Sequence, residues 1–377
     1  MINYLIKPAS SACNLQCGYC FYADVAAHRA VKSYGIMTPE TTEDLIRCAF
    51  TENGDISFAF QGGEPTVAGL EFFKNFVELV NRYNKKNVKV WYSIQTNGFA
   101  VDEEFADFFA ENKFLVGISL DGPREIHDRY RMSKSGGTFD AVMSAISLLT
   151  KAGAEFNILC VVTEHAAKNA KRIWDFYTES GFKFLQFIPC IDGFDQSGEE
   201  YSLTPASFGQ FLKDIFDKYY NAWRHDRYIS VRDLDNFVAM LAGGNPESCG
   251  LAGRCSANAT VEGDGNVYPC DFYVLDKYRL GNVKTNRMIN MLTGDIARQF
   301  VTESLTVHDK CRVCKYDKLC RGGCRRLRNI PPDDNVRADG KAGLYKLCEA
   351  YKTFFAYAMP RMEKMALAFK KSKRQEF

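Results

Sequence analysis

Short apolar runs alternate with amphipathic stretches through the first half of this chain and limit the folds open to it. The runs have the length of buried strands, and the stretches between them repeat apolar residues at helical spacing. The six runs predicted as strands are Ile2–Ile6, Ile56–Phe60, Val88–Ile94, Leu115–Leu120, Phe156–Val162 and Phe182–Ile188. The five stretches predicted as helices are Glu40–Thr51, Leu70–Tyr83, Asp102–Glu111, Phe139–Lys151 and Ala167–Ser180. This order predicts an α/β fold with a parallel sheet, and six βα units are too few to close an eight-stranded barrel.

Three cysteines, Cys13, Cys17 and Cys20, follow the first predicted strand closely. Thiolate sulfur is the usual ligand of iron–sulfur clusters and of zinc. A structural zinc ion takes four protein ligands, and no His lies nearby in the sequence to be the fourth. A cubane cluster held by three thiolates keeps one iron open, which would make this a chemical site. The alternatives are a chance group of cysteines or an incomplete zinc knuckle.

Polar residues and glycines follow the predicted strands, where active sites on parallel sheets gather. Gly-Gly, Asn-Gly and Asp-Gly are also common turn dipeptides, so each segment alone could be an ordinary turn. Their placement after consecutive strands favours one shared binding site. The segments are Gln61–Pro65, Gln95–Gly98, Ser119–Pro123 and Pro189–Asp192.

The cysteine count is high, at 14 in 377 residues. Disulfides are disfavoured in a reducing compartment, so metal or cluster ligation is the better interpretation. Cys48, Cys160 and Cys190 lie in apolar surroundings and are expected to be small core residues. Eight others make two sets of four, enough for two fully ligated clusters or two zinc ions. These are Cys249, Cys255, Cys270, Cys311, Cys314, Cys320, Cys324 and Cys348.

Charge and hydropathy exclude two classes of partner. The formal net charge is +2, which argues against nucleic acid. No apolar signal segment precedes Cys13, and no run is long enough to span a bilayer. We therefore expect a cytoplasmic protein with no membrane partner. An open cluster is oxygen-sensitive, so we also expect an anaerobic or microaerobic host.

The spacing of Cys13, Cys17 and Cys20, with Tyr19 in the aromatic position, resembles the C-x3-C-x-aromatic-C signature of the radical S-adenosylmethionine (SAM) enzymes. The resemblance implies a partial (βα)6 barrel and a SAM-binding [4Fe–4S] cluster. In that family, one electron from the cluster cleaves SAM to methionine and a 5′-deoxyadenosyl radical. A Gly-Gly-Glu-Pro motif holds the methionyl amine of SAM through its backbone. The implied SAM contacts are Gly62, Gly63 and Glu64 for the amine, Ser119 and Arg131 for the ribose and carboxylate, and Tyr19 and Ile191 for the adenosyl part.

The cysteine-rich second half resembles the SPASM extension of these enzymes, which carries two auxiliary [4Fe–4S] clusters. The resemblance implies three clusters in all, with a radical SAM domain over residues 1–230 and a SPASM domain with a C-terminal helix over 231–377. Within it, Thr260–Tyr268 is predicted to form a hairpin with Asp-Gly in its turn. The family pattern would give Cys249, Cys255, Cys270 and Cys324 to one cluster, and Cys311, Cys314, Cys320 and Cys348 to the other.

Nearly the whole chain is similar to the anaerobic sulfatase-maturating enzymes. The stretches that carry the similarity are Leu5–Ser11, Phe58–Thr66, Phe156–Thr163 and Tyr268–Asp276; the segment Ile330–Leu344 departs from it by its length and is expected to be a surface loop. These enzymes oxidise one Cys or Ser of a sulfatase to Cα-formylglycine. The resemblance implies a sulfatase polypeptide with a Cys/Ser-x-Pro/Ala-x-Arg segment as substrate. It also implies an electron donor such as flavodoxin or ferredoxin, and a monomer.

A base must take the thiol or hydroxyl proton when the substrate radical is oxidised. Asp271 follows Cys270 directly and is the candidate, in agreement with the resemblance. The alternatives are a solvated Asp at the end of a hairpin, or a partner for Arg279 or another cation. Gln61 and Tyr22 are polar residues that could orient the peptide or the base.

Two other functions compete with sulfatase maturation. Another SPASM enzyme could form thioether or carbon–carbon crosslinks in a small precursor, although such enzymes often carry an N-terminal leader-binding domain and only twelve residues precede Cys13. A non-catalytic scaffold that binds zinc or clusters would cleave no SAM. The three-cysteine motif together with Gly62–Pro65 argues against the scaffold.

Overall fold

The computed structural model describes residues 2–195, 198–328 and 343–375, and divides into two compact units. The first unit contains Met1–Leu120, His127–Asn157 and Ser256–Val301. The second unit contains Asp121–Ile126, Ile158–Cys255 and Thr302–Phe377. Each unit therefore combines segments that lie far apart in the sequence.

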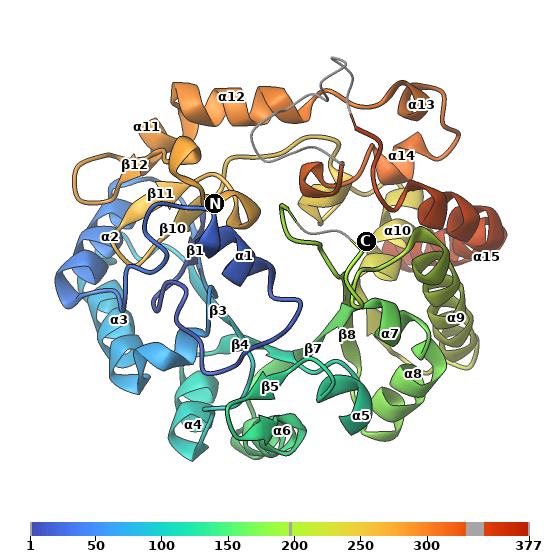
Figure 1. Cartoon of the computed structure of the whole chain (residues 1–377), viewed down its shortest axis with the longest axis horizontal. Helices are drawn as coiled ribbons and strands as arrows, with labels where there is room; N and C mark the ends of the chain where they lie inside the picture. The colour runs from blue at the N-terminus through green and yellow to red at the C-terminus, as the bar shows by residue number, and fades with distance from the viewer. Residues whose placement is uncertain (1, 196–197, 329–342, 376–377) are drawn as a thin grey trace. The chain divides into compact units, whose positions relative to one another are not determined.

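Four parallel strands form the centre of the first unit, with their connecting helices outside them (Figure 1). Tyr4, Phe58, Tyr92 and Phe114 stand side by side in register across them. The strands are β1 (Ile2–Ile6), β2 (Ile56–Phe60), β3 (Val90–Thr96) and β4 (Phe114–Ser119). The outer helices are α2 (Pro39–Thr51), α3 (Leu70–Tyr83), α4 (Glu103–Glu111) and α6 (Phe139–Ala152), whereas α1 (Phe21–Ala27) lies on the inner side of the strands. Short elements here are η1 (Pro65–Ala68), β5 (Met132–Ser133) and β6 (Gly136–Gly137), whereas most of the short helix α5 (Arg124–His127) belongs to the second unit.

Aromatic side chains fill the space between these strands and helices. Phe58 and Phe60 of β2 lie edge-on to Phe76 of α3, with ring centroids 5.0 and 4.9 Å apart. Tyr92 stacks on Phe114 at 5.0 Å. Such pairs bury large apolar areas and fix the angle at which a helix meets a sheet.

The predicted hairpin is present, and it also extends the sheet of the first unit. Strand β10 (Ala259–Val261) pairs in parallel with β1, and β11 (Asn266–Tyr268) and β12 (Gly281–Asn282) follow in antiparallel order. Gly265 has a φ of +81° in the turn, which agrees with the predicted Asp-Gly position. The pairing of β10 with β1 was not predicted. With β10 beside β1, Asp271, which follows β11, contacts Lys7, the residue that follows β1. Further elements are η3 (Asp271–Tyr273), η4 (Asp276–Tyr278), α11 (Met288–Thr293) and α12 (Asp295–Ser304).

The second unit contains three parallel strands covered by long helices. The strands are β7 (Glu155–Val162), which begins in the first unit, β8 (Phe184–Pro189) and β9 (Ser230–Val231). Helix α15 (Cys348–Gln375) lies along α9 (Pro205–Arg224), where the Phe354 ring is 5.8 Å from Phe216 (Figure 1). The other helices are α7 (Glu164–Ala167), α8 (Ala170–Glu179), α10 (Arg232–Leu241), η2 (Cys249–Leu251), α13 (Asp309–Arg312), α14 (Asp317–Cys320) and η5 (Arg325–Leu327).

All six predicted strands and all five predicted helices are present, with shifts at their ends. Strand β3 begins at Val90 because the Asn84 side chain bonds both backbone groups of Val88, at 2.9 Å each, and holds that residue in a turn. Strand β8 begins at Phe184 because Phe182 N–H still donates to the Tyr177 carbonyl at the end of α8. The helix predicted over 167–180 corresponds to α8 and the last residue of α7. Helix α7 is separate and begins after Thr163, whose side chain caps it.

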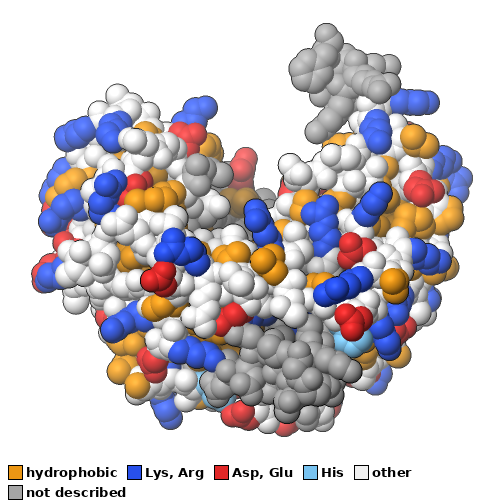
Figure 2. All heavy atoms as spheres, turned by 90° about the horizontal axis from the view of Figure 1, so that it is seen from above, with side chains coloured by type: hydrophobic (Ala, Val, Ile, Leu, Met, Phe, Trp, Pro, Cys, Tyr) orange, Lys and Arg blue, Asp and Glu red, His pale blue; other side chains and the backbone are white. Residues whose placement is uncertain are grey.

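Predictions made for single residues and surfaces have mixed outcomes. Cys48, Cys160 and Cys190 are buried, as expected for core residues. The predicted loop Ile330–Leu344 lies almost wholly outside the described residues. Lys and Arg side chains are spread over the visible face with Asp and Glu between them, in keeping with the small net charge (Figure 2). Within the described ranges, no helix is both long enough and apolar enough to cross a bilayer.

Candidate active site

The loop that carries Cys13, Cys17 and Cys20 is fixed from two sides within the first unit. On one side, Gly63 N–H donates to the Ser10 carbonyl at 2.9 Å, and Glu64 N–H donates to the Ala12 carbonyl at 2.8 Å. On the other side, the backbone N–H groups of Gln16 and Gly18 donate to the carbonyls of Met132 and Tyr130. The loop after β2 and the segment 130–132 therefore determine its path.

Gly63 is required by this close approach. A Cβ atom at this position would lie 2.1 Å from the Ala12 carbonyl oxygen and 2.7 Å from two backbone carbons of the cysteine loop. Gly62 beside it has a φ of +126°, which an L side chain rarely adopts. The Gly-Gly pair thus lets two backbones touch just before Cys13.

Two N–H groups point at the Cys13 sulfur. Leu15 N–H lies 3.3 Å from Sγ, and Asn97 Nδ2, after β3, lies 3.8 Å from it. Hydrogen bonds to the sulfurs of a cluster are one way in which a protein sets its potential, so this environment fits a ligating thiolate. All three thiols are free; Cys13 is exposed and the other two are half-buried. The sequence places Asn97 only at a strand end, because its contact with Cys13 depends on the path of the cysteine loop.

Glu64 holds the loop after β2 to the loop after β3. Its Oε1 accepts from Thr66 N–H, the Thr66 hydroxyl and the Thr96 hydroxyl at 3.0, 2.7 and 2.7 Å, and its Oε2 accepts from Asn97 N–H at 2.7 Å. Burial raises the pKa of Glu64, although these donors lower it in part. The carboxylate is thus engaged internally, which leaves backbone groups of the motif to face a ligand.

The remaining predicted SAM contacts lie in both units. Tyr19 is 8% exposed, with its ring 5.8 Å from that of Tyr130, and the Arg131 guanidinium lies 5.5 Å from the centre of the Tyr19 ring. Ser119 is half-buried at the end of β4. Ile191 follows β8 in the second unit. In the first unit, Arg131 therefore lies beside Tyr19, which is part of the cysteine loop.

Asp271 lies next to this loop. Its Oδ1 forms an ion pair with Lys7 Nζ, and its Oδ2 accepts from Gln61 Nε2 at 2.6 Å. The Asp271 side chain is 18% exposed, while that of Lys7 is fully buried. Phe272 lies edge-on to Phe21 at 4.9 Å, so the residues that follow Asp271 and Cys20 are in contact. Of the alternatives for Asp271, pairing with another cation is the one observed, and that cation is Lys7.

A buried polar network supports Lys7 from behind. Its ammonium lies 3.7 Å from the centre of the Tyr22 ring, and the Tyr22 hydroxyl donates to Glu262. Glu262 also accepts from Arg29 at 2.8 Å, and both of these side chains are fully buried. Burial alone would raise the pKa of Glu262, but the charges of Arg29 and Lys7 hold it below its usual value. Sequence reasoning did not single out Lys7, Arg29 or Glu262, because they meet only through the pairing of β1 with β10.

Removing Arg29 should destabilise the first unit strongly. An Arg29→Met variant leaves the Glu262 charge buried without its main partner, which typically costs about 3–5 kcal/mol. Urea unfolding of the anaerobic protein, followed by circular dichroism, would measure the loss. The matched control is Arg82→Met, because Arg82 forms an exposed pair with Glu78 at 2.8 Å in the same unit and should change stability by less than about 1 kcal/mol.

The same prediction has a pH dependence. The folded-state pKa of Glu262 is lowered, so its stabilising contribution is present above the unfolded-state pKa and is lost as the pH falls through the folded-state value. The difference between wild type and Arg29→Met should therefore shrink on acidification. A difference that grows toward low pH would contradict the assignment of this pair.

Four cysteines of the second unit line one small cavity of about 20 Å³. They are Cys311, Cys314, Cys320 and Cys348, and aromatic side chains such as Tyr345 and Phe355 form much of the remaining wall. Burial, followed by the charges of the other three thiols, raises the pKa of Cys320 to about 12. The four thiols do not converge on a position for a single metal ion. Among the described residues, no three His, Cys, Asp or Glu side chains form such a site. Four thiolates around a cavity are the donor set that a [4Fe–4S] cluster takes.

A second group of thiols in this unit is formed by Cys249, Cys255 and Cys324. Burial, and then the nearby Cys249 and Cys255 thiols, raise the pKa of Cys324 to about 12. Gly250 lies close to Cys324, and Cys255 N–H donates to the Ser304 hydroxyl at 2.8 Å. Cys270, the fourth predicted member, belongs to the first unit.

Arg328 fixes the turn that links these two groups. The turn runs through Arg321, Gly322 and Gly323, all with positive φ, between Cys320 and Cys324. Arg328 is 2% exposed. Its guanidinium donates to four backbone carbonyls: those of Gly322 and Gly323 at 3.0 Å each, Ser304 at 2.7 Å and Thr306 at 3.0 Å. Ser304 in turn accepts from Cys255 N–H. One side chain thus joins the turn to the segment that positions Cys255.

Replacing Arg328 by Met should disorder this junction. The change leaves several buried carbonyls without a donor, and each costs about 1–3 kcal/mol. We expect a lower urea midpoint and less iron retained after anaerobic reconstitution, measured by iron and sulfide analysis. Arg312→Met is the control, since Arg312 is exposed and pairs with the exposed Asp309 at 3.7 Å. Full cluster content in the Arg328→Met protein would contradict the role assigned to this side chain.

Comparison with known proteins gives consistent matches along the chain. Residues 8–192 match the Radical SAM superfamily and residues 249–315 match the SPASM iron-sulfur cluster-binding domain, which confirms the predicted fold class. A cysteine-type anaerobic sulfatase-maturating enzyme of Clostridium perfringens is 46% identical over 369 residues, covering 97% of this chain and 98% of the relative. A serine-type anaerobic sulfatase-maturating enzyme of Bacteroides thetaiotaomicron is 30% identical over 381 residues, covering 96% and 90%. A solved structure described as native anSMEcpe with bound AdoMet and Cp18Cys peptide matches with a TM-score of 0.92 and 45% identity, covering 98% of this chain and 99% of that one.

Proposed function

The chain belongs to the anaerobic sulfatase-maturating enzymes of the radical SAM superfamily, and on this basis we propose that it oxidises one cysteine of a sulfatase to Cα-formylglycine. The higher identity to the cysteine-type relative, 46% against 30% for the serine-type one, supports cysteine rather than serine as the target. The substrate is then a sulfatase segment of the form Cys-x-Pro/Ala-x-Arg.

The observation that carries the proposal is the position of Asp271 beside the cysteine loop. A carboxylate with a buried cation and an amide donor on its two oxygens, and with 18% of its side chain exposed, is placed to accept a proton from a bound group. Contact between Phe21 and Phe272 ties that carboxylate to the loop of Cys13, Cys17 and Cys20. A radical site and a base would thus act on the same substrate residue.

The residues fit the cofactors that the family uses. Cys13, Cys17 and Cys20 would hold the SAM-binding [4Fe–4S] cluster. Cys311, Cys314, Cys320 and Cys348 would hold one auxiliary cluster, and Cys249, Cys255, Cys270 and Cys324 the other. When bound, the first cluster with SAM supplies a 5′-deoxyadenosyl radical, and the auxiliary clusters supply acceptors for one electron. We assign residues 1–230 to the radical SAM domain and 231–377 to the SPASM domain.

The chain's own residues have four tasks in this reaction. Backbone groups of Gly62–Pro65, with Ser119 and Arg131, orient SAM, while Tyr19 and Ile191 flank its adenosyl part. Asp271 accepts the thiol proton once the β-hydrogen has been taken and one electron has left the substrate. Lys7 and Gln61 hold the carboxylate in place, and Tyr22 and Glu262 hold Lys7. Water then replaces sulfur in the thioaldehyde, and hydrogen sulfide leaves.

The electron donor, the oligomeric state and the cellular location are further predictions. A flavodoxin or ferredoxin is proposed as the source of the electron that cleaves SAM, because one-electron carriers of this kind reach the low potentials of such clusters. The monomeric state and the cytoplasmic location stay predictions from the sequence.

The proposal is tested with the reconstituted protein. The protein is loaded anaerobically with iron and sulfide and mixed with SAM, dithionite and a peptide that contains Cys-x-Pro-x-Arg. We expect 5′-deoxyadenosine together with a peptide whose mass shows the loss of sulfur and whose aldehyde is trapped by a hydrazine. The matched control is the same peptide with Ala in place of Cys, which should yield no aldehyde.

Two outcomes would revise the assignment. Deoxyadenosine without any change in the peptide would keep the radical SAM chemistry and move the substrate to another polypeptide, as for a crosslinking SPASM enzyme. The absence of both products in a fully cluster-loaded protein would overturn the catalytic function.

A further inference from the structure

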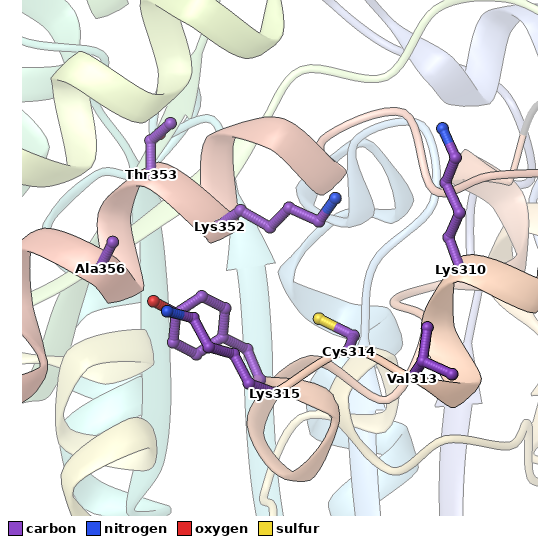
Figure 3. A pocket seen from close by; sticks show the side chains of 8 residues that line it. Lys310, Val313, Cys314, Lys315, Lys352, Thr353 and Ala356 are labelled. Carbon is purple, nitrogen blue, oxygen red and sulfur yellow. The ribbon is translucent and has the colours of Figure 1, made fainter.

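A surface pocket of the second unit lies beside the cavity lined by Cys311, Cys314, Cys320 and Cys348. The pocket has a volume of about 500 Å³, is wide open to solvent, and lies between helix α15 and the segment from α13 to α14. Cys314 lies between Lys352 of α15 and Lys310 of α13, with Val313 next to Lys310 (Figure 3). Lys310, Cys314, Tyr316 and Lys352 line both the pocket and the cysteine cavity. This is therefore a place where the four-thiol site approaches the surface of its unit.

The charged side chains that line the pocket are all lysines. Lys310 and Lys315 are exposed, and the Lys315 ammonium lies 4.9 Å from the centre of the Tyr316 ring. Lys352 is paired with Glu349 at 3.0 Å, but both groups are partly exposed, so the attraction is weak. No carboxylate is among the residues lining this pocket in the described part of the chain. A rim of this kind attracts an acidic surface and accelerates its approach.

An apolar side chain completes the surface. Val313 is 88% exposed, the largest exposed fraction among the large apolar residues described. It lies beside Lys310 at one side of the pocket and precedes Cys314 in the sequence (Figure 3). Interfaces of redox proteins are small and short-lived, and a few apolar contacts within a charged rim are enough for them.

We propose that this pocket, with its three lysines Lys310, Lys315 and Lys352 and the exposed Val313, is the docking surface for an acidic one-electron carrier protein. The proposal rests on the proposed function, in which each turnover releases one electron from the substrate. The carrier docks in its oxidised form beside the thiols that would hold an auxiliary cluster. It gains one electron, and no proton or other group passes between the two proteins.

The test is a binding measurement with a defined probe, an oxidised, strongly acidic two-cluster ferredoxin. Its association with the cluster-loaded protein is followed by biolayer interferometry at about 0.01 M and about 0.15 M salt, between which the Debye length falls from about 30 to about 8 Å. The variant Lys310→Glu/Lys315→Glu/Lys352→Glu should associate at least about tenfold more slowly at low salt and lose most of the salt dependence. Val313→Ser should dissociate faster with the salt dependence unchanged.

The control reverses three exposed lysines elsewhere in the second unit, Lys171→Glu/Lys183→Glu/Lys364→Glu, with the same change in net charge. Binding near that of the wild type in this control supports a local docking surface. Equal losses in both triple variants, unchanged binding in the pocket variant, or displacement of the ferredoxin by the Cys-containing peptide would each overturn the proposal. Iron and sulfide analysis verifies that every variant is loaded.

The two proposals fail in different ways. Aldehyde formation with dithionite tests sulfatase maturation without any carrier protein. A protein that makes aldehyde but binds the ferredoxin equally well after charge reversal retains the function and loses the docking surface. A protein that makes no aldehyde loses the function, whatever its affinity for the ferredoxin.

Discussion

Asp271→Asn should still cleave SAM but form formylglycine at least about 100-fold more slowly than the wild type, the usual range for loss of a positioned base. Asn has nearly the same shape, and one of its atoms can still accept from Gln61, which donates to Asp271 at 2.6 Å. It cannot take a proton from the substrate thiol, and it leaves the buried Lys7 ammonium without its carboxylate. The measurement follows 5′-deoxyadenosine and peptide aldehyde in the same reaction mixtures.

The control is Asp276→Asn, five residues further along the chain. Asp276 accepts from Ala30 N–H at 2.8 Å and belongs to the same unit, so it tests whether any lost carboxylate of this region has the same effect. Its aldehyde yield should stay close to that of the wild type. Wild-type aldehyde yield from Asp271→Asn would remove Asp271 from the mechanism. Loss of deoxyadenosine as well would instead indicate that Asp271 supports the SAM site.

Gly63→Ala should abolish SAM cleavage and lower the iron content by about one third, the share of one cluster in three. The added methyl group would lie 2.1 Å from the Ala12 carbonyl oxygen, far inside van der Waals contact. The loop after β2 would have to move away, and the hydrogen bonds from Gly63 and Glu64 to the cysteine loop would break. Anaerobic iron and sulfide analysis and deoxyadenosine assays measure the two effects.

Gly18→Ala is the matched control because Gly18 lies within the same cysteine loop. A Cβ atom there meets only the Tyr130 ring edge, at an ordinary 3.6 Å, and the φ of Gly18 is not in the left-handed region. This variant should bind iron and cleave SAM much like the wild type. If Gly63→Ala retains full iron content and SAM cleavage, the close approach of the two loops is not required.

The buried network behind Asp271 explains why its carboxylate can be both exposed and fixed. Lys7 is fully buried, yet its ammonium meets Asp271 on one side and the Tyr22 ring on the other. Arg29 balances the charge of Glu262, which accepts from Tyr22. The network orders Lys7 through groups other than Asp271, so a base at this position would need no rearrangement when a peptide binds.

Local sequence patterns were sufficient to predict the strands and helices and the cysteine ligands of a cluster. Strand and helix lengths follow from apolar periodicity, so all six strands and five helices lie close to their predicted positions. Their errors occur at element ends, where single side chains such as Asn84 hold a turn. The cysteine spacing indicated a cluster, and the Gly-Gly pair with the polar strand ends indicated a binding site; the family resemblance implied that its ligand is SAM.

The sequence by itself therefore determined the secondary structure, the ligand types and the family resemblance. Only the tertiary structure decided which groups meet across long separations. Lys7 and Asp271 are 264 residues apart, and they meet because β10 pairs with β1. Arg29 and Glu262, Asn97 and Cys13, and the four thiols around one cavity depend in the same way on the packed chain. Hydrophobic periodicity specifies which face of a strand is buried, but many partner strands can satisfy it, so long-range pairs become visible only in the folded protein.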